Sequence, residues 1–252
     1  MGKLKIWGAA SMASFLAATC LLVSSQAQAL PPPLADKAEI VFSNGGRILS
    51  MQADGSGPTV LTHPDLGEGE YDDGDESPEI SPDGSRLLFL RTNEDQDDVY
   101  TYDLMVASRQ GADPASIGRG ESSNDAVGAT FVDSPTWSAD GQSIFYLEMT
   151  YRKSMLTTRV VRVNTSGSAR LVLASRRVNY KELKYVNGQV RSRDAALYTG
   201  VDASPDGTRL LIDMTSLFYK SGLASDLVAL DLATNKVSTL EKSAEEGSWS
   251  PD

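Results

Sequence analysis

The 252-residue chain is poor in the residues that most often carry catalysis and covalent cross-links. It has one cysteine, Cys20, and one histidine, His63. Cys20 lies in an apolar amino-terminal segment, so we predict no disulfide in the rest of the chain. A Ser-His-Asp arrangement needs a histidine that is held by an acid and faces a serine, and no Gly-x-Ser-x-Gly sequence occurs. We therefore interpret His63 as a loop residue and predict no catalytic residue and no cofactor.

Basic residues are in deficit, and the formal net charge is −11. A field of this sign disfavours a polyanion such as a nucleic acid as a partner. The charges are also uneven: Asp65–Asp103 holds fourteen acids and two bases, whereas Thr150–Ala195 holds eleven bases and two acids. The sequence thus predicts one strongly negative sector and one positive sector.

Long apolar runs are absent except near the amino terminus, where Gly8–Val23 follows Lys3 and Lys5. The small residues of Ala27-Gln28-Ala29 fit a signal-peptidase site ahead of Leu30. We predict a signal peptide at 1–29, a short linker at 30–38 and one exported domain at 39–252, periplasmic or secreted and without a membrane span after cleavage. The alternative is an uncleaved anchor, since the 18 residues of Ile6–Val23 reach the short limit for a span.

What the chain does contain is a repeated tetrapeptide. The copies are Ser81-Pro82-Asp83-Gly84, Ser138-Ala139-Asp140-Gly141, Ser204-Pro205-Asp206-Gly207 and the incomplete Trp249-Ser250-Pro251-Asp252. Each complete copy precedes a short apolar run that is typical of a buried strand: Arg86–Leu90, Ser143–Leu147 and Arg209–Asp213. Because Asp-Gly supplies the positive φ angles that a tight hairpin needs, we predict each motif to be a turn between antiparallel strands.

Further strands are predicted at similar offsets after each motif. They are Val99–Leu104, Arg159–Val163 and Leu227–Leu232, followed by the closing runs Arg170–Leu173 and Val237–Leu240. Four strands joined by tight turns make one propeller blade. The amino-terminal unit gives only three strands, Glu39–Phe42, Arg47–Met51 and Thr59–Thr62. The predicted fold is all-β, a β-propeller of about four four-stranded antiparallel blades whose ring is either closed or incomplete.

The repeat resembles that of the TolB-like β-propeller family, a WD40-like repeat. The resemblance lies in an aromatic or small residue, Ser-Pro-Asp-Gly, an apolar strand, a strand ending in aspartate and a final Leu-Thr, and it covers residues 39–252. It implies a periplasmic, non-enzymatic scaffold that binds a protein or peptide. The same repeat also builds propellers attached to prolyl-oligopeptidase-type hydrolases and lyases. The amino-terminal domain that TolB carries has no room here.

The spacings between motif serines are 57, 66 and 46 residues. A blade of this kind needs about 40–45 residues. We therefore predict inserted loops at Gln110–Val132 and Arg176–Thr199, which serve either specificity or merely as tolerated surface loops. At the chain end, either Gly247–Asp252 pairs with Glu39–Phe42 and closes a four-bladed ring, or the chain is a truncated fragment. The incomplete turn motif favours truncation.

The acidic stretch Asp65–Glu79 invites a calcium hypothesis, because hard cations prefer clustered carboxylate oxygens. The EF-hand spacing fails, since the sixth and twelfth positions counted from Asp73 are Pro78 and Gly84. We interpret the stretch as a solvated acidic loop and predict no metal ligand.

A basic segment interleaved with tyrosines offers a candidate partner-binding surface. Its residues are Arg176, Arg177, Tyr180, Lys181, Lys184, Tyr185, Arg191 and Arg193. Arginine and tyrosine are favoured at binding hot spots, although they also line propeller rims without binding anything.

The leading functional prediction is therefore an exported, protein-binding propeller. The alternatives are the propeller portion of a larger, truncated hydrolase or lyase, and a sensor of sugars or ions that uses the acidic loop.

Overall fold

The computed structural model describes residues 39–66, 73–94, 99–123, 128–179, 181, 185–186, 189–190, 195–216, 224–244 and 247–250. The predicted signal peptide and linker lie outside these residues. The described residues all belong to one compact unit. They form β-strands joined by turns, and they include no helix with the length and apolarity needed to cross a membrane.

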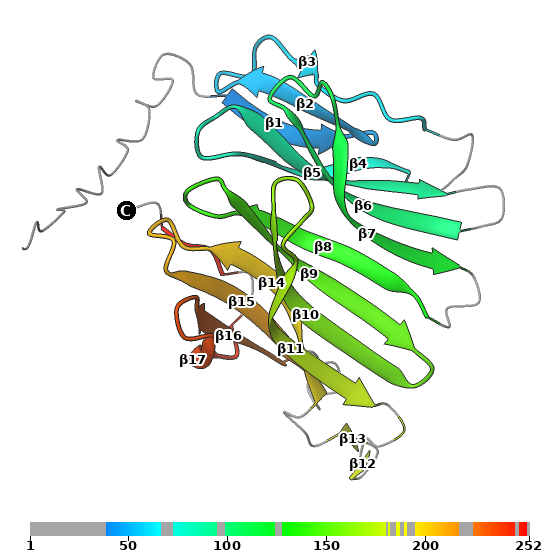
Figure 1. Cartoon of the computed structure of the whole chain (residues 1–252), viewed down its shortest axis with the longest axis vertical. Coiled ribbons are helices and arrows are strands. Elements are labelled where there is room, and N and C mark those ends of the chain that lie inside the picture. The colour runs from blue at the N-terminus through cyan, green and yellow to red at the C-terminus, as the bar shows by residue number, and fades with distance from the viewer. Residues whose placement is uncertain are drawn as a thin grey trace, which may run out of the picture. The chain divides into compact units, whose positions relative to one another are not determined.

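The strands follow one another as antiparallel meanders (Figure 1). Blade 1 consists of β1 (Glu39–Asn44), β2 (Arg47–Gln52) and β3 (Thr59–Val60), and blade 2 of β4 (Gly74–Ile80), β5 (Arg86–Glu94), β6 (Val99–Ser108) and β7 (Ala115–Ser123). Blade 3 consists of β8 (Thr130–Trp137), β9 (Ser143–Arg152), β10 (Met155–Asn164) and β11 (Leu171–Asn179), and blade 4 of β14 (Ala196–Ala203), β15 (Arg209–Ser216), β16 (Ala224–Asp231) and β17 (Lys236–Lys242). A two-residue hairpin, β12 (Tyr185–Val186) with β13 (Gln189–Val190), lies between blades 3 and 4 in the chain. The predicted antiparallel, all-β organisation is confirmed, and the first unit has three strands. Blades 2 and 3 are not separate sheets, because β7 pairs with β8 at Glu121↔Thr130 and joins them into one eight-stranded sheet. The number of blades stays a prediction.

The blades bury their apolar faces against one another. Because side chains alternate across a strand, β5 sends Leu87 and Phe89 toward Ile48 of blade 1, and Leu88 and Leu90 toward blade 3. The same alternation places Phe145 and Leu147 of β9 against blade 4. Each inner blade thus contributes to two cores, which is the packing of a β-propeller-like fold.

The tetrapeptide turns are built from side-chain hydrogen bonds. The Ser81 hydroxyl donates to Asp83 Oδ1 over 2.6 Å and accepts from the Arg86 amide over 2.9 Å. The Ser85 amide donates to the same carboxylate oxygen at 3.0 Å. These bonds lower the pKa of Asp83 to about 2, with the Ser81 hydroxyl as the largest cause. The turns at Ser138 and Ser204 repeat this pattern.

The predicted turn position is right, but the predicted backbone is wrong in one respect. Among Asp83 and Gly84, only the glycine has a positive φ, of 72°. Five residues separate β4 from β5, so the turn is longer than a two-residue Asp-Gly hairpin. Aspartate is needed for its carboxylate, which holds the serine and the following amide.

The predicted inserted loops are also corrected. The range Gln110–Val132 contains β7, the fourth strand of blade 2, which pairs with β6 from Val99↔Ser123 to Val106↔Ala115. Glycines and serines gave β7 a weak strand signal, yet a ladder needs only backbone groups. The range Arg176–Thr199 likewise includes the end of β11 and the start of β14.

A tryptophan before the motif serine ties each of two blades to the one before it. The Trp137 amide donates to Glu79 Oε2 over 3.2 Å, and its indole Nε1 donates to the Glu79 carbonyl over 3.3 Å. Trp249 makes the same pair of bonds to Asp202, at 3.1 and 3.2 Å. Trp137 lies in the core between blades, since it is 3% exposed, whereas Trp249 is half-buried.

This contact also bears on the chain end. Residues 247–250 form no strand, and Trp249 bonds to β14 of blade 4. A closed ring requires these residues to pair with β1. The described residues do not include this pairing. Within them, β1 pairs only with β2.

We expect the Glu79–Trp137 contact to make stability depend on pH. Burial is the largest cause that raises the pKa of Glu79 from its ordinary 4.5 to about 7, and the nearby charge of Asp202 adds to it. Stability should therefore be full below about pH 4.5 and fall as the pH rises through about 7, because the folded state resists ionisation of this carboxyl. The measurement is the thermal unfolding midpoint at about pH 5 and about pH 8.

The matched variant is Glu79→Gln, whose amide oxygen can still accept from Trp137 but cannot ionise. Its midpoint should change less between the two pH values than that of the wild type. An equal change in both proteins would contradict the role assigned to Glu79.

Candidate functional site

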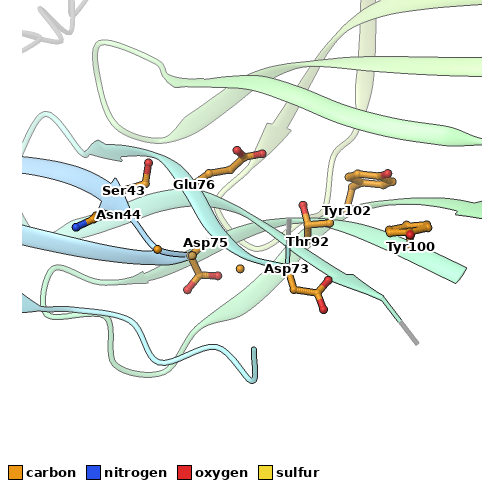
Figure 2. A pocket seen from close by; sticks show the side chains of 11 residues that line it. Ser43, Asn44, Asp73, Asp75, Glu76, Thr92, Tyr100 and Tyr102 are labelled. Atoms are coloured by element: carbon orange, nitrogen blue, oxygen red, sulfur yellow. The ribbon is translucent and has the colours of Figure 1, made fainter. Parts of the chain in front are cut away.

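A polar cavity of about 510 Å³ lies where the β1–β2 turn of blade 1 meets blade 2. We call it the turn pocket. Its lining residues are Ser43, Asn44, Gly45, Gly46, Asp73, Gly74, Asp75, Glu76, Thr92, Tyr100 and Tyr102. Figure 2 shows the labelled side chains, contributed by the end of β1, the beginning of β4, and β5 and β6. The size suits a small molecule or one or two side chains of a peptide.

Main chain makes up much of the turn pocket. Gly45 and Gly46 have φ angles of 58° and 72°, so Asn44↔Arg47 closes a two-residue hairpin of the type that twisted strands prefer. The Asp75 amide donates to the Gly46 carbonyl over 2.9 Å. A Cβ on Gly74 would lie 2.4 Å from Gly46 Cα, so the two backbones touch and neither position has room for a side chain.

One wall of the pocket is fixed by an ion pair. Asp75 is fully buried and binds Arg91 through two parallel bonds, Nε–Oδ1 at 2.6 Å and Nη2–Oδ2 at 2.8 Å. The two residues also face each other across the β4–β5 ladder. The pair raises the pKa of Arg91, with the hydrogen bond to Asp75 as the largest cause. Because its charge is neutralised and its geometry is rigid, Asp75 holds the pocket rather than binding a ligand.

The remaining polar groups carry the recognition chemistry. In Figure 2, Glu76 projects from the opposite side of β4 to Asp73 and Asp75. The Oδ1 atom of Asp73 is buried and has no hydrogen-bond partner among the described residues. The ring of Tyr102 packs at a tilt of 54° against that of Phe131 of blade 3, with 4.9 Å between the centroids, and burial raises the pKa of the Tyr102 phenol. Carboxylates beside tyrosine rings favour a cationic group.

The predicted acidic stretch is only partly described. Asp65 is exposed, residues 67–72 lie outside the description, and Asp73, Asp75 and Glu76 enter the turn pocket. Glu79 instead binds Trp137. No group of three or more histidine, cysteine, aspartate or glutamate side chains in the described ranges is arranged to hold a metal ion. His63 is exposed and follows β3.

The predicted basic surface is also only partly described. Arg176 lies on β11 and donates from Nε to the Ala196 carbonyl of blade 4 over 2.6 Å, so it ties two blades together. Arg177 and Lys181 are exposed. Tyr185 belongs to the short hairpin. Four predicted residues lie outside the description: Tyr180, Lys184, Arg191 and Arg193. This surface stays a prediction.

Most of the turn pocket was missed in the sequence. Asn44-Gly45-Gly46 between two alternating apolar runs is a strong hairpin signal. Tyr100 and Tyr102 are two residues apart and therefore share one face of β6. Both signals concern single strands, however, and nothing in them indicates that blade 1 places its turn against β4.

Comparisons with known proteins match no family model and no curated protein. Solved structures do resemble the chain. The tricorn protease is 13% identical with a TM-score of 0.48, over 82% of this chain and 21% of its own. Prolyl oligopeptidase B from Galerina marginata is 14% identical with a TM-score of 0.44, over 83% of this chain and 29% of its own.

An oligogalacturonate lyase from Vibrio parahaemolyticus is 13% identical with a TM-score of 0.40, over 82% of this chain and 47% of its own. The chain thus spans less than half the length of each of these three structures. The propeller-like fold rests on the blades described above, and these likenesses carry no statement about activity.

We expect the contact between the two glycine backbones to be essential for the pocket. Gly74→Ala should destabilise the protein by about 2–4 kcal/mol, because the new Cβ collides with Gly46 at a φ of 140°. Gly55→Ala is the matched control, since Gly55 has a φ of 82° and open space around it. It should cost only about 1 kcal/mol. Urea unfolding measures both, and equal losses would refute the close contact.

Proposed function

We propose that the protein is a non-enzymatic, TolB-like propeller that binds a protein or peptide partner, and that the turn pocket receives a cationic side chain of that partner. The observation that carries the proposal is the pocket itself. It combines a rigid wall and backbone with the buried, unpartnered Asp73 Oδ1 and two tyrosines. What supports a non-enzymatic function is the sequence, which has a single histidine and no Gly-x-Ser-x-Gly motif.

The charge of the site supports a cationic rather than an anionic ligand. Arg91 compensates Asp75, and the buried Oδ1 atom of Asp73 has no hydrogen-bond partner among the described residues. No lysine or arginine is among the described residues that line the pocket. A lysine or arginine side chain could place its charge at the carboxylates while its apolar stem lies along a tyrosine ring.

The same proposal includes that the protein is exported and binds its partner outside the cytoplasm. What supports export is the amino-terminal pattern of Lys3 and Lys5, an apolar run and Ala27-Gln28-Ala29.

A second candidate function is the propeller portion of a larger hydrolase or lyase. One observation favours it: blade 1 leaves Ile40 and Val60 about two-fifths exposed, at 41% and 40%, on the face that points away from blade 2. An apolar sheet face is normally covered by further protein. Several of the similar structures are hydrolases or lyases, and this chain corresponds to less than half of the length of each.

Titration calorimetry with N-acetyl-arginine amide and N-acetyl-lysine amide tests the leading proposal, with N-acetyl-glutamine amide as the neutral probe. The two cationic probes should bind, and the neutral probe should not. Asp73→Asn and Glu76→Gln should each weaken binding about tenfold, the worth of one charge-assisted hydrogen bond.

Asp113→Asn is the matched control, because Asp113 is an exposed acid outside the pocket. It should leave the affinity within about twofold. Absence of binding, or equal losses in all three variants, would overturn the pocket assignment. Peptidase or lyase activity in purified residues 39–252 would overturn the non-enzymatic reading instead.

A further inference from the structure

A second cavity, of about 450 Å³, lies on blade 3 and has the opposite charge. It opens on the face of the sheet that also carries Ile144 and Tyr146 toward blade 2 (β9 and β10 in Figure 1). Its charged lining consists of Arg152, Arg159, Arg170 and Glu148. Three guanidinium groups and one carboxylate leave an excess of two positive charges, in a chain whose net charge is −11.

The single carboxylate organises two of the arginines. Arg159 Nη1 donates to Glu148 Oε1 over 3.1 Å, and Arg170 Nη2 donates to Oε2 over 2.6 Å. Arg159 Nη1 is also 2.9 Å from the Thr150 hydroxyl oxygen. The Glu148 side chain is only 17% exposed, so it holds the two guanidinium groups from inside the cavity wall.

The arrangement has more donors than acceptors. A guanidinium carries five N–H donors, and each carboxylate oxygen of Glu148 is already used. The side chains of Arg159 and Arg170 are 31% and 43% exposed, so donors not used by Glu148 are accessible from the cavity. Arg152 has no ion pair within the described part of the chain.

The threonines extend the donor set. Thr150 and Thr157 face each other across the β9–β10 ladder and line the cavity between Arg159 and Arg152. Hydroxyl donors beside arginines are typical partners of carboxylate and phosphate oxygens. The described lining of this cavity thus keeps two positive charges in excess.

We propose that this cavity binds a small ligand with more than one oxyanion group, a carboxylate or a phosphate. Arg159 and Arg170 are preset by Glu148 to hold one acidic group, and Arg152 reaches a second. The site is separate from the turn pocket and independent of it, because the two cavities share no lining residue and take ligands of opposite charge.

Calorimetric titration of residues 39–252 with citrate and with inorganic phosphate, at low ionic strength, tests this site. Citrate should bind more tightly than phosphate, because it presents two acidic groups at once, and the reverse order would contradict the second acidic group of the proposal. Arg152→Gln should weaken citrate binding about tenfold, since it removes one charge-assisted contact. Arg152 is exposed and outside every ion pair described, so this variant should fold normally.

The matched control is Arg162→Gln, which removes the same charge from the same blade. Arg162 is exposed and alternates with Val161 and Val163, so it points to the opposite face of β10. It should change citrate affinity less than twofold. If neither anion binds, or if both variants weaken binding equally, the cavity holds no specific ligand and the proposal is wrong.

Discussion

The two inner blades of this protein each bury two apolar faces, and this packing positions the elements around them. A four-stranded sheet cannot cover itself, so blades 1 to 4 supply one another with cover through Ile48, Leu88 and Phe145 and their neighbours. The packing of blade 1 on blade 2 brings the β1–β2 turn against β4. It leaves a polar cavity, the turn pocket, where the two blades meet. The turn pocket is a product of this packing, whereas the second cavity is lined by residues of blade 3.

Directional bonds complement the apolar packing. Trp137 and Trp249 each place an amide and an indole N–H on an acidic residue of the preceding blade, Glu79 and Asp202. Before the motif serine Ser204, the tryptophan is replaced by Ala203. The residue of blade 3 that corresponds to Glu79 and Asp202 is Thr136, which is not an acid. Tryptophan and acid thus occur together, which indicates that the pair sets how one blade is aligned on the next. An apolar contact alone would allow the blades to slide.

Much of this fold could be predicted from the sequence, because each copy of the repeat is a short, continuous segment. Ser-Pro-Asp-Gly marked each first turn, and the apolar runs after it located the core strands. The features that the sequence did not predict, β7 and the turn pocket, depend on contacts between separate segments of the chain. β7, which contains Gly118 and Gly120, forms because neighbouring backbones pair with it, and the turn pocket exists because residues 46 and 74 meet in space. The basic segment was predicted from composition, yet Arg176 is committed to the Ala196 carbonyl.

The backbone contact between Gly46 and Gly74 has a consequence for how such a site can change. Because this part of the pocket is main chain, its shape is insensitive to most substitutions around it. In the proposed binding site, the groups that would meet a ligand are a few lining side chains, such as Asp73, Glu76 and Tyr100. They can be exchanged one at a time without rebuilding the scaffold. A protein of this kind can acquire a new specificity in single mutational steps while its fold stays the same.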